Sequence, residues 1–407
     1  MAIAQGINKT IAYKKQSGLN VTASGAGGQL IRRETGMLMV QKDTYEISEI
    51  VSHQQSTGAI HGVAKSSGTI NGVLSGASYQ DFQGSLVRKA WVATTAITAL
   101  SLTIAASGAN YTITRAAGDY LAGGIKVGDV IQLSGGSLNA NNITKNLVVI
   151  AVTATVITAN VLNTGSTLTV EGPIASCTVT VTGKKSWAPT SGHTSDYYTF
   201  EEFYSDLTRS AVFPDVQIGM MDLSVPATGL VSSNYSLVGL GAVTKSGTQS
   251  LTAPTAATTT NVMSSVSGAV YVGGVRYATI TGINIKIDGQ VNPGEATVGS
   301  NTIADVFRGR IKVGGSFTWV YDADTLGTPF ESETLTSIMV VLSDARTDAA
   351  NTMAFVMSAV KLFSNDPDDG EKQIVRTVNY TAQINGSGGA ALANLQTIIS
   401  IQDSQAV

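Results

Sequence analysis

The chain has 407 residues, of which 13% are charged, about half the usual quarter, and Gly, Ser, Thr, Ala and Val dominate. With only 25 Lys and Arg residues and a formal net charge of −3, it offers no basic face for tight binding to a phosphate backbone. It contains one cysteine and no run of 18 apolar residues, so we expect neither an intramolecular disulfide nor a membrane span. It shows no secretory leader pattern, and we therefore expect assembly in the cytosol.

The N-terminal part is predicted to be an arm followed by strands. Residues 1–36 are polar and rich in glycine, and we expect them to be poorly ordered alone and to order on a neighbouring molecule. From Thr44 the pattern is typical of a strand, and residues 52–67 are expected to form a loop rich in Gln, Ser, Gly and His. Ser66–Ser75 then alternates, which predicts a strand with Ile70 on one face.

Residues 93–186 are expected to form an inserted all-β surface domain, either a small barrel or an Ig-like module. Apolar runs alternate there with Gly and Asn turns, and no helical period occurs. Trp91 and Trp187, which flank the segment, should lie close together, because insertions are tolerated where their ends meet at a surface. The single Cys177 lies in a Thr/Val run and is expected to be a small buried hydrophobe.

After the insert we expect a strand at 197–201, a short helix at 202–209, strands at 216–225 and from 230, and a linker at 240–268. The second half repeats this kind of pattern. Its expected elements are strands at 269–272, 278–287, 315–322 and 353–363, a helix within 333–345, a turn at 365–370 and a strand from 374.

Two pairs of strands indicate a tandem duplication. Asn234, Tyr235 and Ser236 recur 145 positions later as Asn379, Tyr380 and Thr381, and Gly68–Leu74 finds its best counterpart 247 positions later in Gly315–Tyr321. The two offsets differ by about the length of the insert. We therefore expect a first domain from residues 1–92 plus 187–250 and a second domain from residues 251–407, with the insert in the first copy.

The last strand of each copy is predicted to have one polar and one apolar face, because side chains alternate along a strand. Val231, Tyr235 and Leu237 share the apolar face of the first copy, and Tyr380 and Ala382 that of the second, which predicts a β-sandwich. The polar face must contact water, another subunit or a channel. The alternative to a functional face is an ordinary surface that is only solvated. Its members are Ser232, Asn234, Ser236, Thr377, Asn379, Thr381 and Gln383.

Three stretches, Thr44–Tyr79, Tyr197–Gly239 and Gly128–Val152, resemble the tail tube (major tail) protein of long, non-contractile-tailed bacteriophages of the siphophage type. The resemblance implies a hollow tube of stacked rings through which double-stranded DNA passes without specific binding. It also implies a tape measure protein, a tail-tip initiator and a tail terminator as partners, and a place in the virion after assembly in the host cytoplasm. The polar residues of the two last strands would then line the lumen.

Two tandem copies favour rings of three chains with pseudo-sixfold symmetry, and six chains per ring is the alternative. The candidate ring-stacking segments are the N-terminal arm and the loop at 52–67, in particular His53, Gln54, Gln55 and His61.

Catalytic, cofactor and metal sites are not expected. The three histidines lack the Cys or carboxylate spacing of a zinc site, Asp366, Asp368 and Asp369 lack the Gly and Glu of an EF-hand, and the acidic group Asp322, Asp324, Glu331 and Glu333 has no cleft-forming scaffold. The alternative functions are a β-rich tail-tip, decoration or adhesin protein whose insert binds host glycans, and a tube protein of a bacterial secretion system.

Overall fold

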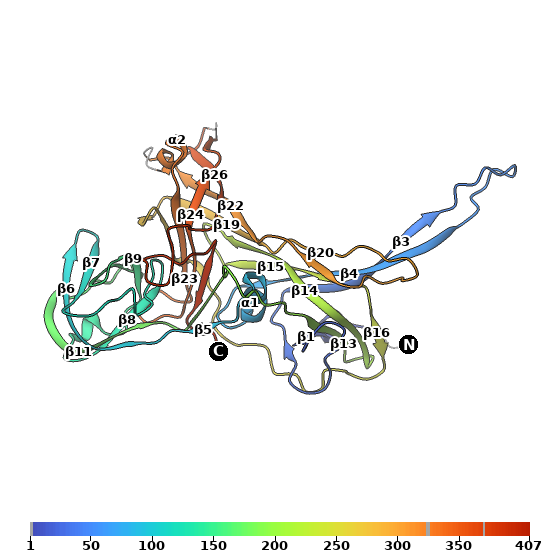
Figure 1. Cartoon of the computed structure of the whole chain (residues 1–407), viewed down its shortest axis with the longest axis horizontal. Helices are drawn as coiled ribbons and strands as arrows, with labels where there is room; N and C mark the ends of the chain where they lie inside the picture. The colour runs from blue at the N-terminus through green and yellow to red at the C-terminus, as the bar shows by residue number, and fades with distance from the viewer. Residues whose placement is uncertain (1–2, 323–325, 369–370) are drawn as a thin grey trace.

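The computed structural model describes residues 3–322, 326–368 and 371–407 (Figure 1). The fold is all-β, as predicted from the composition, and combines large antiparallel sheets with a small closed barrel. Helices are short: the described residues contain α1 (Gln80–Val87) and α2 (Thr328–Glu331), besides two 3-10 turns at Gly6–Asn8 and Ala140–Asn142.

The first copy is a sandwich of two sheets that share one long strand. Its strands are β1 (Lys9–Lys15), β2 (Gln29–Leu30), β3 (Thr35–Glu46), β4 (Ala59–Val73), β13 (Tyr198–Tyr204), β14 (Arg209–Val225), β15 (Ser232–Gly239) and β16 (Thr244–Ser246). One sheet pairs β1 with β13 and β13 with β14, and the other pairs β3 with β4, β4 with β15, and β15 with β14. The first half of β14 thus belongs to one sheet and its second half to the other.

The second copy repeats these neighbours. Its strands are β17 (Ser264–Val272), β18 (Val275–Tyr277), β19 (Ile280–Asp288), β20 (Val291–Pro293), β21 (Val306–Arg308), β22 (Lys312–Val320), β23 (Thr336–Ser343), β24 (Thr352–Leu362), β25 (Asp366–Pro367), β26 (Val375–Ala382) and β27 (Ser400–Asp403). The order β17–β23–β24 matches β1–β13–β14, and β19–β22–β26–β24 matches β3–β4–β15–β14. Helix α2 follows β22 as α1 follows β4, so the two copies share one topology.

The register of the repeat differs by two residues from the best sequence match. Tyr235 lies opposite Ile70 in β4, and its counterpart Tyr380 lies opposite Gly315 in β22, whereas the sequence paired Ile70 with Phe317. Because side chains alternate with a period of two, a shift of two residues leaves the same face toward the core. The match of residues was therefore wrong, but the match of strands and of faces was right.

One seam joins the copies into a single sheet. Strand β14 pairs with β15 along one edge and with β19 along the other, from Met220 opposite Asp288 to Val225 opposite Ile283. The strand order β3–β4–β15–β14–β19–β22–β26–β24 is consequently continuous across the duplication. In Figure 1 the sheet extends from the β3–β4 hairpin on the right to β22, β24 and β26 at the upper left.

The inserted segment is a closed barrel with its own core. Its strands are β6 (Ile97–Ser107), β7 (Asn110–Arg115), β8 (Val130–Gly135), β9 (Leu147–Val152), β10 (Val156–Val161) and β11 (Glu171–Val181), closed in the order β10–β7–β6–β11–β8–β9. Cys177 is buried in this core, as expected, and burial raises the pKa of its thiol. The small barrel, one of the two architectures predicted, is confirmed.

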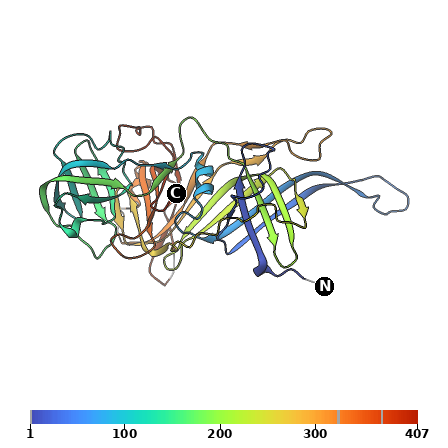
Figure 2. The same ribbon diagram turned by 90° about the horizontal axis from the view of Figure 1, so that it is seen from below.

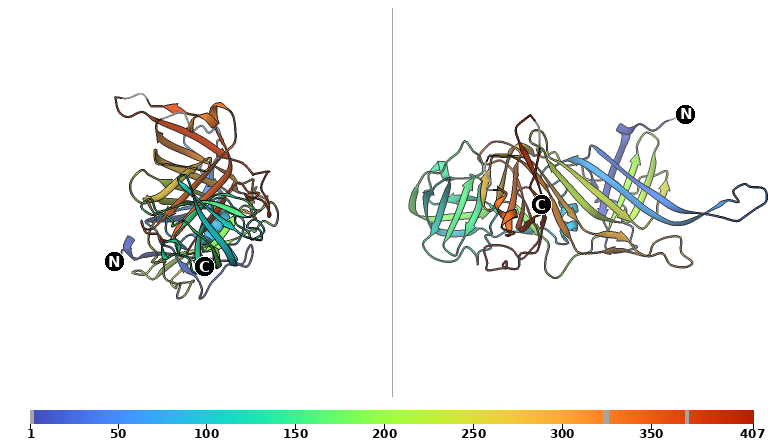
Figure 3. Two further views of the ribbon diagram at one scale, coloured as in Figure 1. Left: turned by 90° about the vertical axis from the view of Figure 1, so that its left-hand side faces the viewer. Right: turned by 90° about the horizontal axis from the view of Figure 1, so that it is seen from above.

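The barrel lies at one end of the molecule and the β3–β4 hairpin at the other (Figure 2). The chain enters the barrel through β5 (Val92–Ala93) and leaves it through β12 (Lys184–Trp187), and these two strands pair with each other. The ends of the insert therefore meet, as expected. Strand β12 also pairs with β27, which extends the outer sheet of the second copy, and the C-terminus lies near the middle of the molecule (Figure 3).

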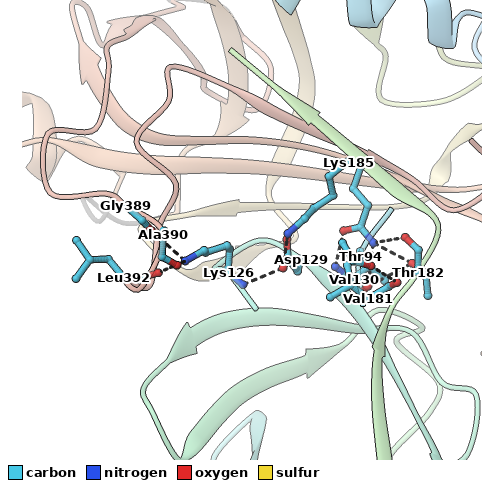
Figure 4. A network of polar contacts seen from close by, with 11 residues as sticks. Thr94, Lys126, Asp129, Val130, Val181, Thr182, Lys185, Gly389, Ala390 and Leu392 are labelled. Atoms are coloured by element: carbon cyan, nitrogen blue, oxygen red, sulfur yellow. Dashed lines mark hydrogen bonds and ion pairs between the residues drawn. The ribbon is translucent and has the colours of Figure 1, made fainter. Parts of the chain in front are cut away.

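The barrel packs firmly against the second copy. Apolar side chains from both sides form one buried cluster, which contains Val130, Val148, Leu162, Ala269, Tyr271, Met339, Val341, Ala354 and Val356. Beside it, Lys185 and Asp129 form an ion pair with 2.9 Å between Nζ and Oδ2, and both side chains are 7% exposed (Figure 4). The ammonium of Lys126 donates to three carbonyl oxygens of the C-terminal segment, those of Gly389, Ala390 and Leu392.

Both helices expected in the sandwich domains were placed wrongly. Residues 202–209 contain the end of β13, a turn and the start of β14, and residues 333–345 contain β23. The neighbouring Glu201 in β13 is buried, and its carboxylate accepts hydrogen bonds from the N–H groups of Ser250 and Leu251, 2.7 Å each. Strand β23 is buried on both faces, which removes the alternation that marks a half-exposed strand.

Candidate functional site

The polar residues predicted from alternation share the solvent side of the continuous sheet. On β15, Asn234 is exposed and Ser232 and Ser236 are half-buried; on β26, Asn379 and Thr381 are exposed and Thr377 is half-buried. Gln383 follows the end of β26 and is exposed. The structure thus places all seven candidates on exposed or half-exposed positions of equivalent strands.

The reverse face of the same strands is buried. The ring of Tyr235 lies 5.0 Å from that of Tyr79 and 5.4 Å from that of Phe82, centroid to centroid. Tyr380 donates from its hydroxyl to the Asn284 carbonyl oxygen at 2.8 Å. Burial raises the pKa of both Tyr235 and Tyr380, so both phenols stay neutral at physiological pH. These aromatic anchors fix which side of each strand faces solvent.

Four charged residues on this polar face were not predicted. Asp222 in β14 lies opposite Lys286 in β19, and Asp288 lies opposite Lys312 in β22. The amide of Asn284 also donates to the Asp222 carboxylate. Directly opposed residues of opposite charge stabilise a sheet, and here they alternate across the seam between the copies.

A signal for these residues is present in the sequence. Strand β19 alternates strictly, with Ile283, Ile285 and Ile287 buried and Asn284, Lys286 and Asp288 turned the other way. The parity of this strand alone indicates that Lys286 and Asp288 lie on the polar face. The partner Asp222 was harder to recognise, because β14 begins in a sheet that is buried on both faces.

Around the seam the polar face carries two aspartates and two lysines, and its positions on β15 and β26 are Ser, Thr and Asn. Farther from the seam, Lys361 and the apolar Met37 and Phe363 lie on the same face. The four charges at the seam balance, so this part of the face offers no uncompensated Lys or Arg, on which phosphate binding depends.

The second candidate surface is the hairpin formed by β3 and β4, which projects far from the body of the molecule (Figure 1). His53, Gln54 and Gln55 lie in its exposed tip, where His53 Nδ1 accepts a hydrogen bond from the N–H of Gln55 at 3.3 Å. His61 lies in β4, in a segment paired with Thr44. The expectation of a loop over residues 52–67 was therefore wrong from residue 59 onward.

The ring of Tyr45 packs directly over Gly62 in this segment. A Cβ atom on Gly62 would lie within 3 Å of the ring of Tyr45 on the facing strand. The tip itself is apolar as well as polar, and its large exposed hydrophobic residues are Tyr45, Ile47, Ile50 and Ile60. These exposed apolar side chains make the hairpin a candidate contact surface.

The N-terminal arm was expected to lack order in the isolated chain, and this expectation was wrong for most of it. Strand β1 pairs with β13 and buries Ile11 and Tyr13 in the core of the first copy. The following segment is also fixed to its own chain, since Lys14 Nζ donates to the carbonyl oxygens of Ser24 and Ala26. Alternation over residues 9–15 was too short and too polar to be recognised.

The acidic and histidine residues considered for chemistry do not converge. Among the residues that the structure describes, no three His, Cys, Asp or Glu side chains are arranged to hold a metal ion. Asp322, Glu331 and Glu333 are exposed, and Asp324 and Asp369 lie outside the described residues. In the described part of the chain, no helix has the length and apolar character needed to cross a membrane.

A comparison with protein families matches nearly the whole chain. A family model described as phage tail tube protein matches residues 6–383, which include both sandwich copies, the seam and the barrel. No curated protein matches the chain.

Proposed function

The chain belongs to the phage tail tube protein family, and on that basis we propose that it is the repeating subunit of a siphophage-type tail tube. As a member of the family it is a structural component of a phage tail. In our proposal, chains polymerise as stacked rings around a channel through which genome DNA is ejected into the host. The observation that carries the proposal is the continuous polar sheet face shared by the two copies.

Three chains per ring is the arrangement that this sheet favours. Each copy contributes four strands in the same order, and the seam between β14 and β19 already joins them within one chain. Closing such sheets into a barrel leaves no open edge, which removes the sites where strands otherwise aggregate. Six pseudo-equivalent copies then surround the channel, with Ser232, Asn234, Ser236, Thr377, Asn379, Thr381 and Gln383 in its wall.

Stacking is proposed to involve the β3–β4 hairpin, including His53, Gln54, Gln55 and His61. A head-to-tail contact of this type repeats without closing and therefore builds a tube. The tube would start on a tail-tip initiator, surround a tape measure protein and end at a terminator. Assembly is proposed to occur in the host cytoplasm.

Electron microscopy of the purified protein tests the proposal. We expect annular rings or tubes, and a cryo-EM cross-section with three chains per turn in which both copies line the lumen. Six chains per ring, with only one copy at the lumen, would contradict the trimer. Persistent monomers that adsorb to host cells would contradict the tube and support the adhesin alternative.

The neutral lumen is tested by adding positive charge to it. We expect Asn234→Lys together with Asn379→Lys to slow DNA release from phage particles and to make release faster as salt is raised, because each added lysine binds phosphate by counterion release. Thr155→Lys on the exposed surface of the barrel is the matched control. Release that is unchanged in the double variant would place these strands away from the DNA.

A further inference from the structure

The seam between the two copies provides a template for the contact between neighbouring chains. Within one chain, the outer edge of β14 pairs with β19, so that Met221 lies opposite Ile287 and Asp222 opposite Lys286. In a pseudo-sixfold ring, the second copy of one chain meets the first copy of the next in the same way. The repeat then identifies which strand edges would take the places of β14 and β19 at the junction between two chains.

Both equivalent edges are open in the described chain. Strand β3, the counterpart of β19, pairs with β4 alone. The counterpart of the second half of β14 is the end of β24 together with β25, and from residue 361 to 367 this segment pairs with β26 alone. Because β26 occupies one side only, the opposite side of residues 361–367 has no strand partner among the described residues.

We propose that the β24–β25 edge of one chain pairs antiparallel with the β3 edge of the next, with Leu362 opposite Leu38 and Phe363 opposite Met37. The pairing rests on the proposed function, since it requires a ring. Its register follows from the strand pairs that the copies share: Leu362 lies opposite Tyr380 as Met221 lies opposite Tyr235, and Leu38 lies opposite Gly68 as Ile287 lies opposite Val313.

Burial of the four side chains agrees with this register. Leu38 and Leu362 are 5% and 2% exposed, and they point into the sandwich as Ile287 and Met221 do. Met37 and Phe363 are 49% and 59% exposed, although both are apolar. Pairing would bring these two exposed residues together, so the apolar pair replaces the Asp222 and Lys286 pair of the internal seam.

The open β3 edge is covered by side chains of its own chain. The N–H of Leu38 donates to Glu202 Oε1 at 2.9 Å, and Lys9 Nζ donates to the Gly36 carbonyl oxygen at 3.3 Å. Lys9 and Glu202 also form an ion pair, with 2.8 Å between Nζ and Oε1. The two side chains therefore remain paired with each other when a neighbouring strand replaces their contacts with β3. A charged cover of this kind protects an edge from unspecific pairing and yields to a neighbouring strand in the ring.

A cysteine pair tests the register directly. Met37→Cys with Phe363→Cys places two thiols at a non-hydrogen-bonded position, where Cα atoms are about 4.5 Å apart and a disulfide fits. Within one chain six strands lie between the two edges, which makes seven inter-strand spacings, about 34 Å along the sheet, so an intramolecular bond is out of reach. Native Cys177 is buried and contributes no background.

After assembly and oxidation with copper phenanthroline in air, we expect a ladder on non-reducing gels that ends at three chains. Gln41→Cys with Phe363→Cys lies four residues, about 13 Å, out of register and should give little product. Equal cross-linking in this control, or assembled rings that stay uncross-linked in the Met37 and Phe363 variant, would overturn the register while leaving the tube intact. Absence of rings in the wild type would overturn the tube and the seam together.

Should the cysteine variant itself fail to assemble, hydrogen exchange on the wild type decides. The N–H of Leu362 faces the open edge, and we expect its exchange to slow about tenfold or more between monomer and ring. Unchanged exchange over residues 362–366 in wild-type rings would overturn the proposal.

Discussion

At the residue scale, Gly315 shows how closely the backbones of β19 and β22 approach. A Cβ atom built on Gly315 would lie 2.0 Å from the carbonyl oxygen of Asn284 and 3.0 Å from the Tyr380 hydroxyl. Because the nearest atom belongs to the backbone of a paired strand, it moves only if the sheet deforms. The position accepts no side chain, although its backbone conformation is ordinary.

We expect Gly315→Ala to lower the free energy of unfolding by about 2 kcal/mol, the cost of overpacking a filled site. Gly282→Ala is the matched control, because it lies in the adjacent strand and its Cβ would have no atom nearer than 3.5 Å. Urea unfolding followed by tryptophan fluorescence measures both variants. Equal stability of the two would mean that the β19–β22 contact is looser than the geometry shows.

A second residue-scale prediction concerns Asp348, which links the loop after β23 to the barrel. Its carboxylate accepts from Asn163 at 2.8 Å and from Ser166 at 3.0 Å, and Lys145 Nζ lies 3.3 Å away. Burial alone would raise the pKa of Asp348, but these hydrogen bonds and the lysine charge outweigh burial and hold the pKa below its usual value. The contact therefore favours the ionised form.

A pKa that is lower in the folded than in the unfolded chain gives stability above the unfolded value, about 3.9, and this stability is lost as the pH falls through the folded value. We expect Asp348→Asn to cost about 1 kcal/mol at pH 7, since the group is partly solvated, and clearly less at pH 3, where part of the ionised form is lost. Thermal melts at the two pH values measure the difference. A gap between variant and wild type that is the same at both would contradict the role of the charge.

How far single residues could be predicted depended on clean alternation. Ser232, Asn234 and Ser236 were sorted correctly because β15 has one wet and one buried face. The charges at Asp222 and Lys286 were missed because their strands were not sorted by parity and their pairing joins positions 64 residues apart. Which exposed face lines a channel does not follow from alternation at all, and stays a prediction.

At the element scale, a buried ion pair lies beside the apolar cluster that joins the barrel to the second copy. Lys185 in β12 contacts both carboxylate oxygens of Asp129 at 2.9 Å, and Asp129 also accepts from the Lys126 N–H at 2.8 Å. Taking a charge out of water is costly, so each member of the pair needs the other.

We expect Lys185→Met to destabilise the protein by about 3 kcal/mol, because it leaves the Asp129 charge buried without a cation. Adding Asp129→Asn should recover more than half of that loss, since the amide oxygen still accepts from Lys126. Apparent melting temperatures of the single and double variants provide the measurement. If the double variant melts no higher than Lys185→Met, the loss comes from packing and not from the unpaired charge.

The type of element was predicted correctly where a strand is half-exposed, and the prediction failed where a strand is buried on both faces. Strand β23 reads TSIMVVLS, and its five central residues are all apolar, so the two-residue period of a strand cannot be seen there. The pair Glu201 and Glu202 favours a helix by propensity, yet both carboxylates are buried and bind N–H groups or a lysine of other segments. Tertiary contacts of this kind override local preference.

At the scale of the whole molecule, the duplication and the closed barrel followed from the sequence, since a repeat keeps its strand pattern and an insert keeps its own turns. The docking of the barrel did not follow. It depends on a buried cluster of segments distant in the sequence, which includes Val130 and Val356, and no periodicity reveals it. The insert was predicted only as a surface domain. In the structure it also covers the outer sheet of the second copy.

That cover leads to the last prediction, on removal of the barrel. Strands β5 and β12 pair with Ala93 opposite Lys184, so residues 94–183 can be replaced by a two-residue Asn-Gly turn that suits a hairpin. The deletion uncovers the apolar face of β17, β23 and β24, with Tyr271, Met339, Val341, Ala354 and Val356. We expect the shortened chain to aggregate, because an exposed apolar patch of this kind drives association.

Light scattering after size-exclusion chromatography, together with binding of a hydrophobic dye, measures the effect. Restoring polarity with Met339→Thr, Val341→Thr and Val356→Thr in the deletion background should return a soluble chain, which separates exposure of the patch from failure to fold. Removal of the hairpin tip, residues 48–57, is the matched control, because that segment covers no core cluster. A barrel-free chain that stays monomeric and binds no dye would show that the second copy stands without its cover, and the barrel would then be a passive attachment.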